Sequence, residues 1–150
     1  MGNILYDACL KRQTNKMKLY QLQGNYRCKV VDVYDGDTVT IILINKFGFE
    51  KHKLRMYGYD SPEIKPKHDI PNREAEISKA KAAKQFLSDL VLNKITIFES
   101  MGYDKYGRLL GKLYLKESCL KSKMEINQYM IDNHHGYTYY GGTKKISSSI

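Results

Sequence analysis

Five short stretches of this chain either alternate apolar and polar residues or are rich in β-branched ones, and both patterns favour β-strands. The stretches are Tyr26–Tyr34, Thr38–Ile44, Phe49–Tyr57, Ile95–Glu99 and Leu109–Leu115. Between the third and the fourth, residues 72–92 carry Ala80, Ala83, Leu87 and Leu90 at helical spacing. The sequence therefore predicts short strands interrupted once by a long helix.

The order of these elements limits the fold class. A second, C-terminal helix is predicted over residues 123–133, and 150 residues suffice for one domain with a real core. We predict an α+β fold: a five-stranded OB-fold barrel with a long helix between strands 3 and 4. The domain should cover residues 25–141, after a basic flexible leader (1–24) and before a loose tail (142–150).

The charge balance favours a polyanionic partner. The chain carries a net charge of +9 and contains thirteen tyrosines but no tryptophan. Positive charge suits nucleic acid or an anionic membrane surface, and tyrosine rings can stack on bases. Composition alone leaves a merely solubilising surface equally open.

Cysteine usage and the N-terminus bear on location. The three cysteines show no paired spacing, which argues against a disulfide framework. Residues 1–19 mix charged and polar types and lack the apolar run of a signal peptide. We expect an intracellular, cytoplasmic protein.

The first residues also raise the question of lipid modification. Gly2 would be exposed once the initiator Met1 is removed, and Cys9 lies close enough to carry a second acyl chain. Acylation at both would tether the protein to a membrane. Tyr6 stands where the usual myristoylation pattern has Ser or Thr, so an unmodified, disordered leader is the favoured alternative.

Three short motifs carry residues that can do chemistry. They are Asp35-Gly36-Asp37-Thr38-Val39, Arg55 with Asp60-Ser61-Pro62-Glu63, and Asp104-Lys105-Tyr106-Gly107-Arg108. Each motif alone is most often an ordinary turn or a solvated strand residue. Together they supply two aspartates, a glutamate and two arginines, which is what metal-assisted phosphodiester cleavage requires.

On these motifs, in this order, the chain resembles the staphylococcal nuclease (thermonuclease) family from about Tyr26 to Tyr140. The resemblance implies a site for one Ca²⁺ ion, held by the carboxylates of Asp37 and Asp60 and by the backbone carbonyl of Ser61. The family usually has threonine at the position of Ser61, but a carbonyl ligand does not depend on the side chain.

The resemblance also assigns roles to charged and aromatic residues. Glu63 corresponds to the catalytic glutamate, acting as general base or as a water orienter, and Arg55 and Arg108 to the two catalytic arginines. The substrate-binding positions implied are Lys105, Tyr106 and Tyr137.

The function implied by the resemblance is a Ca²⁺-dependent nuclease, acting as a monomer on DNA or RNA with low sequence specificity. The alternative is a non-catalytic nucleic-acid-binding module on the same fold. A binding module need not keep the metal aspartates, the glutamate and both arginines. Because all five are present, the sequence favours the enzyme.

Overall fold

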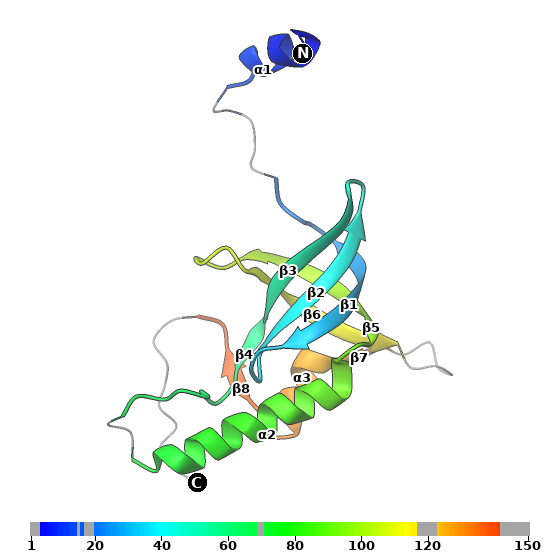
Figure 1. Ribbon diagram of the computed structural model, residues 1–150. Coiled ribbons are helices and arrows are strands. Elements are labelled where there is room, and N and C mark those ends of the chain that lie inside the picture. Colours follow the sequence, from blue (N-terminus) through cyan, green and yellow to red (C-terminus); the bar gives the residue numbers. More distant parts are fainter. Residues whose placement is uncertain (1–3, 15, 17–19, 69–70, 117–122, 142–150) are drawn as a thin grey trace.

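The computed structural model describes residues 4–14, 16, 20–68, 71–116 and 123–141 (Figure 1). Within these residues the barrel strands are β1 (Asn25–Val33), β2 (Thr38–Asn45), β3 (Gly48–Met56), β5 (Ile95–Tyr103) and β6 (Leu109–Lys116). Shorter strands are β4 (Gly58–Asp60), β7 (Lys123–Glu125) and β8 (Tyr137–Tyr139). The helices are α1 (Ile4–Lys11), α2 (Arg73–Val91) and α3 (Ile126–Asp132).

The main sheet closes on itself. Its strand order is β3-β2-β1-β5-β6-β7, and an additional parallel pairing between β3 and β6 joins the first strand to the fifth. All other pairings in this sheet are antiparallel. Closure leaves no free edge between these five strands, and the predicted five-stranded barrel is confirmed.

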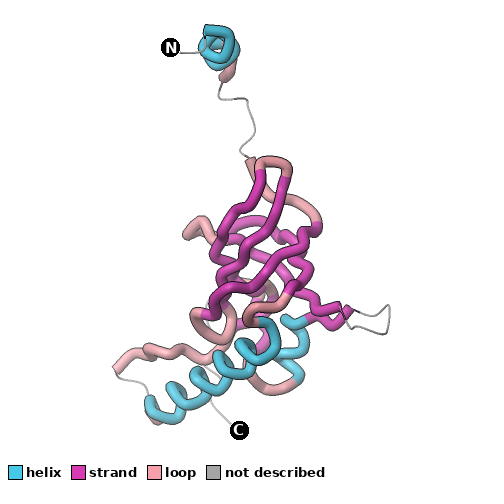
Figure 2. The backbone as a smooth tube through the Cα atoms, turned by 45° about the vertical axis from the view of Figure 1, so that its right-hand side comes forward, coloured by secondary structure: helices cyan, strands magenta, loops and turns pink. Residues whose placement is uncertain are grey.

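The barrel core is built from alternate residues of every strand. Val30, Ile41, Leu54, Phe98 and Leu113 each come from a different strand and are fully buried. They form one apolar cluster with side chains of α2 and α3. Figure 2 shows both helices at one end of the barrel, opposite the β2–β3 turn.

The long helix lies where the sequence predicts it, between the third and fourth barrel strands. Ala80, Ala83 and Leu87 are buried as expected, and Val91 completes the buried stripe. Asn72, which we expected to cap the helix, occupies the N-cap position but makes no side-chain capping bond. Its left-handed backbone explains this difference, because a capping side chain normally requires an extended conformation there.

The C-terminal part of the domain differs from the expectation in two ways. Residues 123–125, predicted as the first turn of a helix, form β7 and pair with β6, so α3 begins at Ile126. Residues 58–60 form β4, which pairs with β8 in a small second sheet that periodicity did not reveal. Strands of three residues are too short to show an alternating pattern.

The segment before β1 is anchored to the barrel. Leu22 is buried in the core, and its carbonyl accepts a hydrogen bond from Ser100 Oγ at 2.6 Å, although the sequence places it in the leader. The leader also contains α1, which we did not predict. Cys9 is exposed on this helix, whereas Gly2 and the tail at 142–150 lie outside the described residues. In the described part of the chain, no helix combines the length and apolarity needed to cross a membrane.

Gly111 provides a test of barrel packing. A side-chain carbon added there would collide with the Phe98 ring and with the Glu99 backbone carbonyl. Gly111→Ala should therefore lower the free energy of unfolding by about 1–3 kcal/mol, measured by urea denaturation, as overpacked cores do. The control Lys53→Ala, at an exposed position of β3, should change it by less than about 0.5 kcal/mol. Equal stability of the two variants would contradict this packing.

Candidate active site

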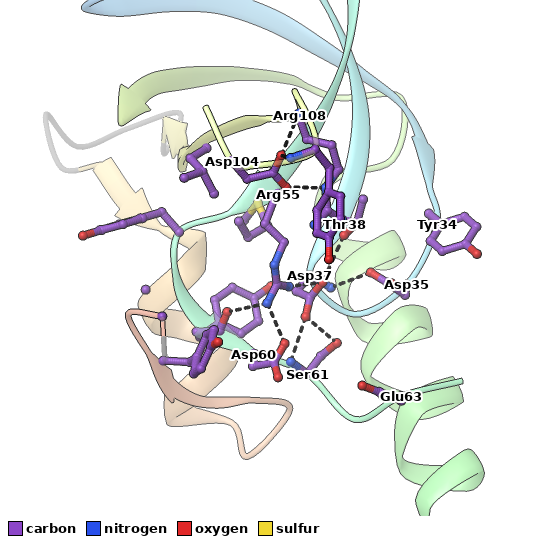
Figure 3. A pocket seen from close by; sticks show the side chains of 18 of the residues that line it. Tyr34, Asp35, Asp37, Thr38, Arg55, Asp60, Ser61, Glu63, Asp104 and Arg108 are labelled. Atoms are coloured by element: carbon purple, nitrogen blue, oxygen red, sulfur yellow. Dashed lines mark hydrogen bonds and ion pairs between the residues drawn. The ribbon is translucent and has the colours of Figure 1, made fainter. Parts of the chain in front are cut away.

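A cavity of about 1130 Å³ opens beside the small second sheet. Its walls come from the β1–β2 turn, the end of β3, the segment 57–65, the β5–β6 loop and the segment 139–141. From α2, only Lys84 reaches it. Figure 3 shows the charged side chains converging on this cavity from several elements. Motifs that are far apart in the sequence therefore line one open cavity.

Arg55 lies at the centre of the site, between two aspartates. Its guanidinium forms an ion pair with Asp37 and a second one with Asp60, Nη2 to Oδ1 at 2.5 Å. Both carboxylates are buried, and the Arg55 side chain is only 14% exposed. Arg55 also donates to the backbone carbonyl of Tyr59 at 3.4 Å. One cation thus joins the start of β2, the end of β3 and the end of β4.

The β1–β2 turn holds Asp37 in place. Asp35 Oδ1 accepts a hydrogen bond from the Asp37 backbone N–H at 3.1 Å, which closes the turn on itself. Gly36 packs so tightly that an added Cβ would lie 2.7 Å from Ser61 Cβ and 2.9 Å from Ala83 Cβ. Tyr59 donates its hydroxyl to the Gly36 carbonyl at 2.7 Å. A glycine is required here because of close approach rather than for an unusual backbone angle.

Ser61 binds Asp37 through two donors. Its backbone N–H and its hydroxyl both donate to Asp37 Oδ2, at 2.9 and 3.0 Å. Thr38 Oγ1 donates to the other oxygen, Oδ1, at 3.0 Å. The sequence analysis gave the Ser61 side chain no role, but the structure shows that its hydroxyl orients the carboxylate. A threonine would offer the same donor.

Tyr137 contacts a predicted metal ligand. It lies opposite Asp60 in the β4–β8 pairing, and its hydroxyl donates to Asp60 Oδ2 at 2.8 Å. The sequence placed Tyr137 among the substrate-binding residues. In the structure it positions Asp60, while Tyr139 and Tyr140 line the cavity.

Asp104 organises the β5–β6 loop. Its Oδ1 accepts the backbone N–H groups of Tyr106 and Arg108 at 2.8 and 2.9 Å, and its Oδ2 binds Arg108 Nε at 2.6 Å. The Lys105 ammonium lies 5.0 Å from the centre of the Tyr106 ring. The sequence analysis assigned no role to Asp104. An acid four residues before an arginine, across a glycine turn, is the signal that could have identified it.

The remaining predicted residues line the same cavity. Glu63 lies on the wall near α2, and Arg108 lies on the wall formed by the β5–β6 loop (Figure 3). Lys105 and Tyr106 line the cavity beside Arg108. The structure therefore brings Asp37, Arg55, Asp60 and Ser61 into direct contact, and it places Glu63 and Arg108 around them.

The electrostatics of the site follow from burial and from Arg55. Burial alone would raise the pKa of Asp37, but the charge and hydrogen bonds of Arg55 outweigh this and hold that pKa below its ordinary value. Burial and the nearby negative charge of Asp37 raise the pKa of Asp35 to about 6. Asp37 is thus charged at neutral pH, next to an aspartate that is harder to ionise.

The donors present suit a hard cation. In the part of the chain that the structure describes, no group of three or more His, Cys, Asp or Glu side chains gathers into a metal site. Asp37, Asp60 and the Ser61 carbonyl supply oxygen only, and both carboxylates are buried. Such a set fits Ca²⁺, which takes oxygen ligands and completes its shell with water or phosphate. It does not fit a metal that needs imidazole or thiolate.

Comparison with known proteins identifies the family that this chain matches. Residues 53–145, more than half of the chain, match the family described as staphylococcal nuclease homologue. Two curated proteins, from Escherichia coli O157:H7 and from Escherichia coli, are each 28% identical over 103 residues, and each is described as an uncharacterized endonuclease. The alignment covers 69% of this chain and 54% of each relative, so the chain spans about half the length of the curated relatives it matches.

Removing the Arg55 charge should destabilise the fold. Arg55→Met leaves two buried carboxylates without their counter-charge, so we expect a loss of about 3–5 kcal/mol in unfolding free energy at neutral pH. Arg108→Met is the control, because the Arg108 side chain is 32% exposed and its pair with Asp104 should contribute less than about 1 kcal/mol.

The same variant should show a defined pH dependence. The ion pair lowers the pKa of Asp37 in the folded state. Its contribution to the free energy of unfolding is therefore complete above the unfolded-state pKa of about 3.9, and it is lost as the pH falls through the lower folded-state pKa. The stability difference between wild type and Arg55→Met should shrink below about pH 4. A difference independent of pH, in denaturant titrations from neutral to acid, would contradict the ion pair.

Proposed function

Because this chain belongs to the staphylococcal nuclease homologue family, we propose that it is a nuclease that uses Ca²⁺ to hydrolyse phosphodiester bonds of DNA, RNA or both. The observation that carries the proposal is the cavity in which Arg55 joins two buried aspartates while Glu63 and Arg108 line the walls. The description of both relatives as endonucleases supports the same class of reaction.

The reaction replaces one bond to phosphorus with another. A water oxygen forms a bond to phosphorus and loses a proton to Glu63 or to solvent, the bond to the leaving oxygen breaks, and the leaving oxygen takes up a proton from solvent. Glu63 is the residue that accepts a proton from the attacking water or orients it. Asp37, Asp60 and the Ser61 carbonyl would hold Ca²⁺, which when bound polarises the phosphate.

The two arginines stabilise the negative charge that develops on the phosphate. Each guanidinium is oriented by aspartate before substrate arrives, Arg55 by Asp37 and Asp60, and Arg108 by Asp104. Preorganised donors need no rearrangement during reaction, which is how such groups lower a barrier. The planar guanidinium of arginine can donate hydrogen bonds to two phosphate oxygens at once, whereas the ammonium of lysine lacks this bidentate geometry.

Low sequence specificity follows from the kinds of residue in the cavity. Arg55, Arg108, Lys105 and Lys84 carry positive charge suited to phosphate, a group that every nucleotide shares. Tyr106 offers an aromatic face, which accepts any base by stacking. These contacts bind the backbone and a base plane without reading a sequence.

Conservative replacement of either arginine tests the catalytic assignment. Arg55→Lys and Arg108→Lys should each lower kcat by about a hundredfold or more, with KM changed far less, because charge is kept while the bidentate fork is lost. Arg27→Lys, an exposed position on β1 outside the cavity, is the matched control. Near-normal turnover by Arg55→Lys in a nuclease assay would remove the assignment. Binding without cleavage by wild type would favour a non-catalytic nucleic-acid-binding module.

Metal dependence follows from the all-oxygen donor set. Purified protein stripped with a chelator should lose activity, regain it with Ca²⁺ and fail to regain it with Zn²⁺. Mg²⁺ should restore little, because it demands stricter octahedral geometry. Asp37→Asn should raise the Ca²⁺ concentration that is needed for half-maximal activity. Full activity in chelator alone would show that no metal takes part.

A further inference from the structure

An apolar patch lies at the turn between β2 and β3. Ile44, Phe47 and Phe49 are 54%, 68% and 80% exposed, and Tyr20 packs edge-on against Phe47 with ring centres 5.8 Å apart. We call these four residues the hairpin-tip patch. Two of the chain's four phenylalanines therefore face solvent. Neighbouring exposed apolar side chains of this kind mark an interaction surface.

Basic residues surround this patch. Side chains alternate across a strand, so Phe49 and Lys51 share the outer face of β3 with Lys53. Lys29 of β1 pairs with Ile42 on the same face, and the Lys46 ammonium lies 4.9 Å from the centre of the Phe47 ring. All four lysines and the nearby Arg27 are exposed.

Two acidic residues lie near this surface, and neither is in register with Phe49. Glu50 is close enough to Tyr20 for its negative charge to act on the Tyr20 hydroxyl. Glu50 falls on the alternate face of β3 and binds His52 at 2.9 Å. Asp32, the exposed acid of β1, pairs with Thr40, which lies towards the cavity end of β2. The hairpin tip therefore presents apolar side chains within a positively charged surface.

The patch and the cavity occupy opposite ends of one hairpin. Thr38 and Arg55 pair at the cavity, whereas Asn45 and Gly48 pair at the tip. Seven residues of strand separate these ends, which is about 23 Å. Figure 1 shows the tip at the top of the barrel and α2 at the bottom. A partner bound at the tip would leave the cavity open.

The composition of the patch selects one class of partner. Phenylalanine and isoleucine enter the boundary between lipid headgroups and acyl chains, while flanking lysines attract anionic headgroups. A second copy of the chain would place like charges against each other. Nucleic acid would gain little from Ile44, which neither hydrogen-bonds a base nor stacks on one.

We propose that the hairpin-tip patch is a membrane-docking surface that inserts Phe47 and Phe49 into an anionic bilayer and leaves the cavity facing the aqueous phase. This inference does not depend on the proposed nuclease activity. Tyr20 places the point where the leader joins the described barrel at the same end as the patch. One acyl chain alone binds membranes weakly, and the patch supplies a second contact.

Fluorescence can test insertion directly, since the chain contains no tryptophan. Phe47→Trp in the full, unacylated chain should show a blue-shifted emission with vesicles of phosphatidylcholine and phosphatidylserine, and quenching by brominated lipid. Tyr34→Trp, exposed at the cavity end, should show neither. Chelator is present throughout, so that neither hydrolysis nor Ca²⁺ bridging contributes. Equal shifts at both positions, or none at Phe47→Trp, would overturn the proposal.

Vesicle co-sedimentation separates the apolar and charged contributions. Phe47→Ser with Phe49→Ser should reduce binding at least about tenfold, and Lys51→Glu with Lys53→Glu about fivefold or more per position. The control pair Lys79→Glu with Lys81→Glu makes the same charge change on exposed positions of α2 and should change binding less than about twofold. Circular dichroism shows that each variant is folded.

The following results would overturn the docking surface. Wild type could fail to bind anionic vesicles, or the two phenylalanines could be replaced without loss. Alternatively, the phenylalanine variant could keep vesicle binding and lose affinity for duplex DNA in chelator, which would assign the patch to nucleic acid. Size-exclusion chromatography tests whether a second copy of the chain occupies the patch. A dimer that the phenylalanine variant abolishes would make the patch an interface between copies.

Discussion

The buried ion pairs of Arg55 are the interaction on which the site depends. Two carboxylates out of water, close to one another, would repel and lose hydration, and Arg55 compensates both. The pairs also fix the geometry of the chain, since Asp37 precedes β2, Arg55 belongs to β3 and Asp60 ends β4. Ser61 and Tyr137 then complete the carboxylate shells with hydrogen bonds. A single cation thus organises three separate segments.

Barrel closure brings the second arginine to the first. β3 and β6 run parallel, with Arg55 opposite Leu110, and this pairing puts the loop that precedes β6 beside the end of β3. Arg108 lies two residues before Leu110 and is held by Asp104. Without this long-range pairing, the β5–β6 loop would have no reason to face the aspartates. The same closure that removes sheet edges therefore assembles the cavity.

The positive charge of the chain is divided between two ends of the barrel. At the cavity it consists of Arg55, Arg108 and nearby lysines. Aspartates partly compensate the charge of the two arginines, and the basic side chains together suit phosphate. At the hairpin tip, lysines surround exposed phenylalanines, and the exposed acid of β1, Asp32, lies further along the same face, across Thr40 from Lys53. A net charge of +9 would suggest one polyanionic partner, but the arrangement provides two chemically different surfaces.

The sequence by itself determined the five strands and the long helix, and it supplied the candidate site residues, because strand and helix periodicity and local motifs are short-range properties. Only the tertiary structure decided how those residues meet: that Arg55 joins Asp37 to Asp60, that Tyr137 binds Asp60, and that Leu22 belongs to the core. The short strands β4, β7 and β8 and the exposure of the hairpin tip were decided in the same way. The physical reason is that these features arise from contacts between residues distant in the chain, and no local pattern encodes which partner a buried carboxylate or an outward phenylalanine will find.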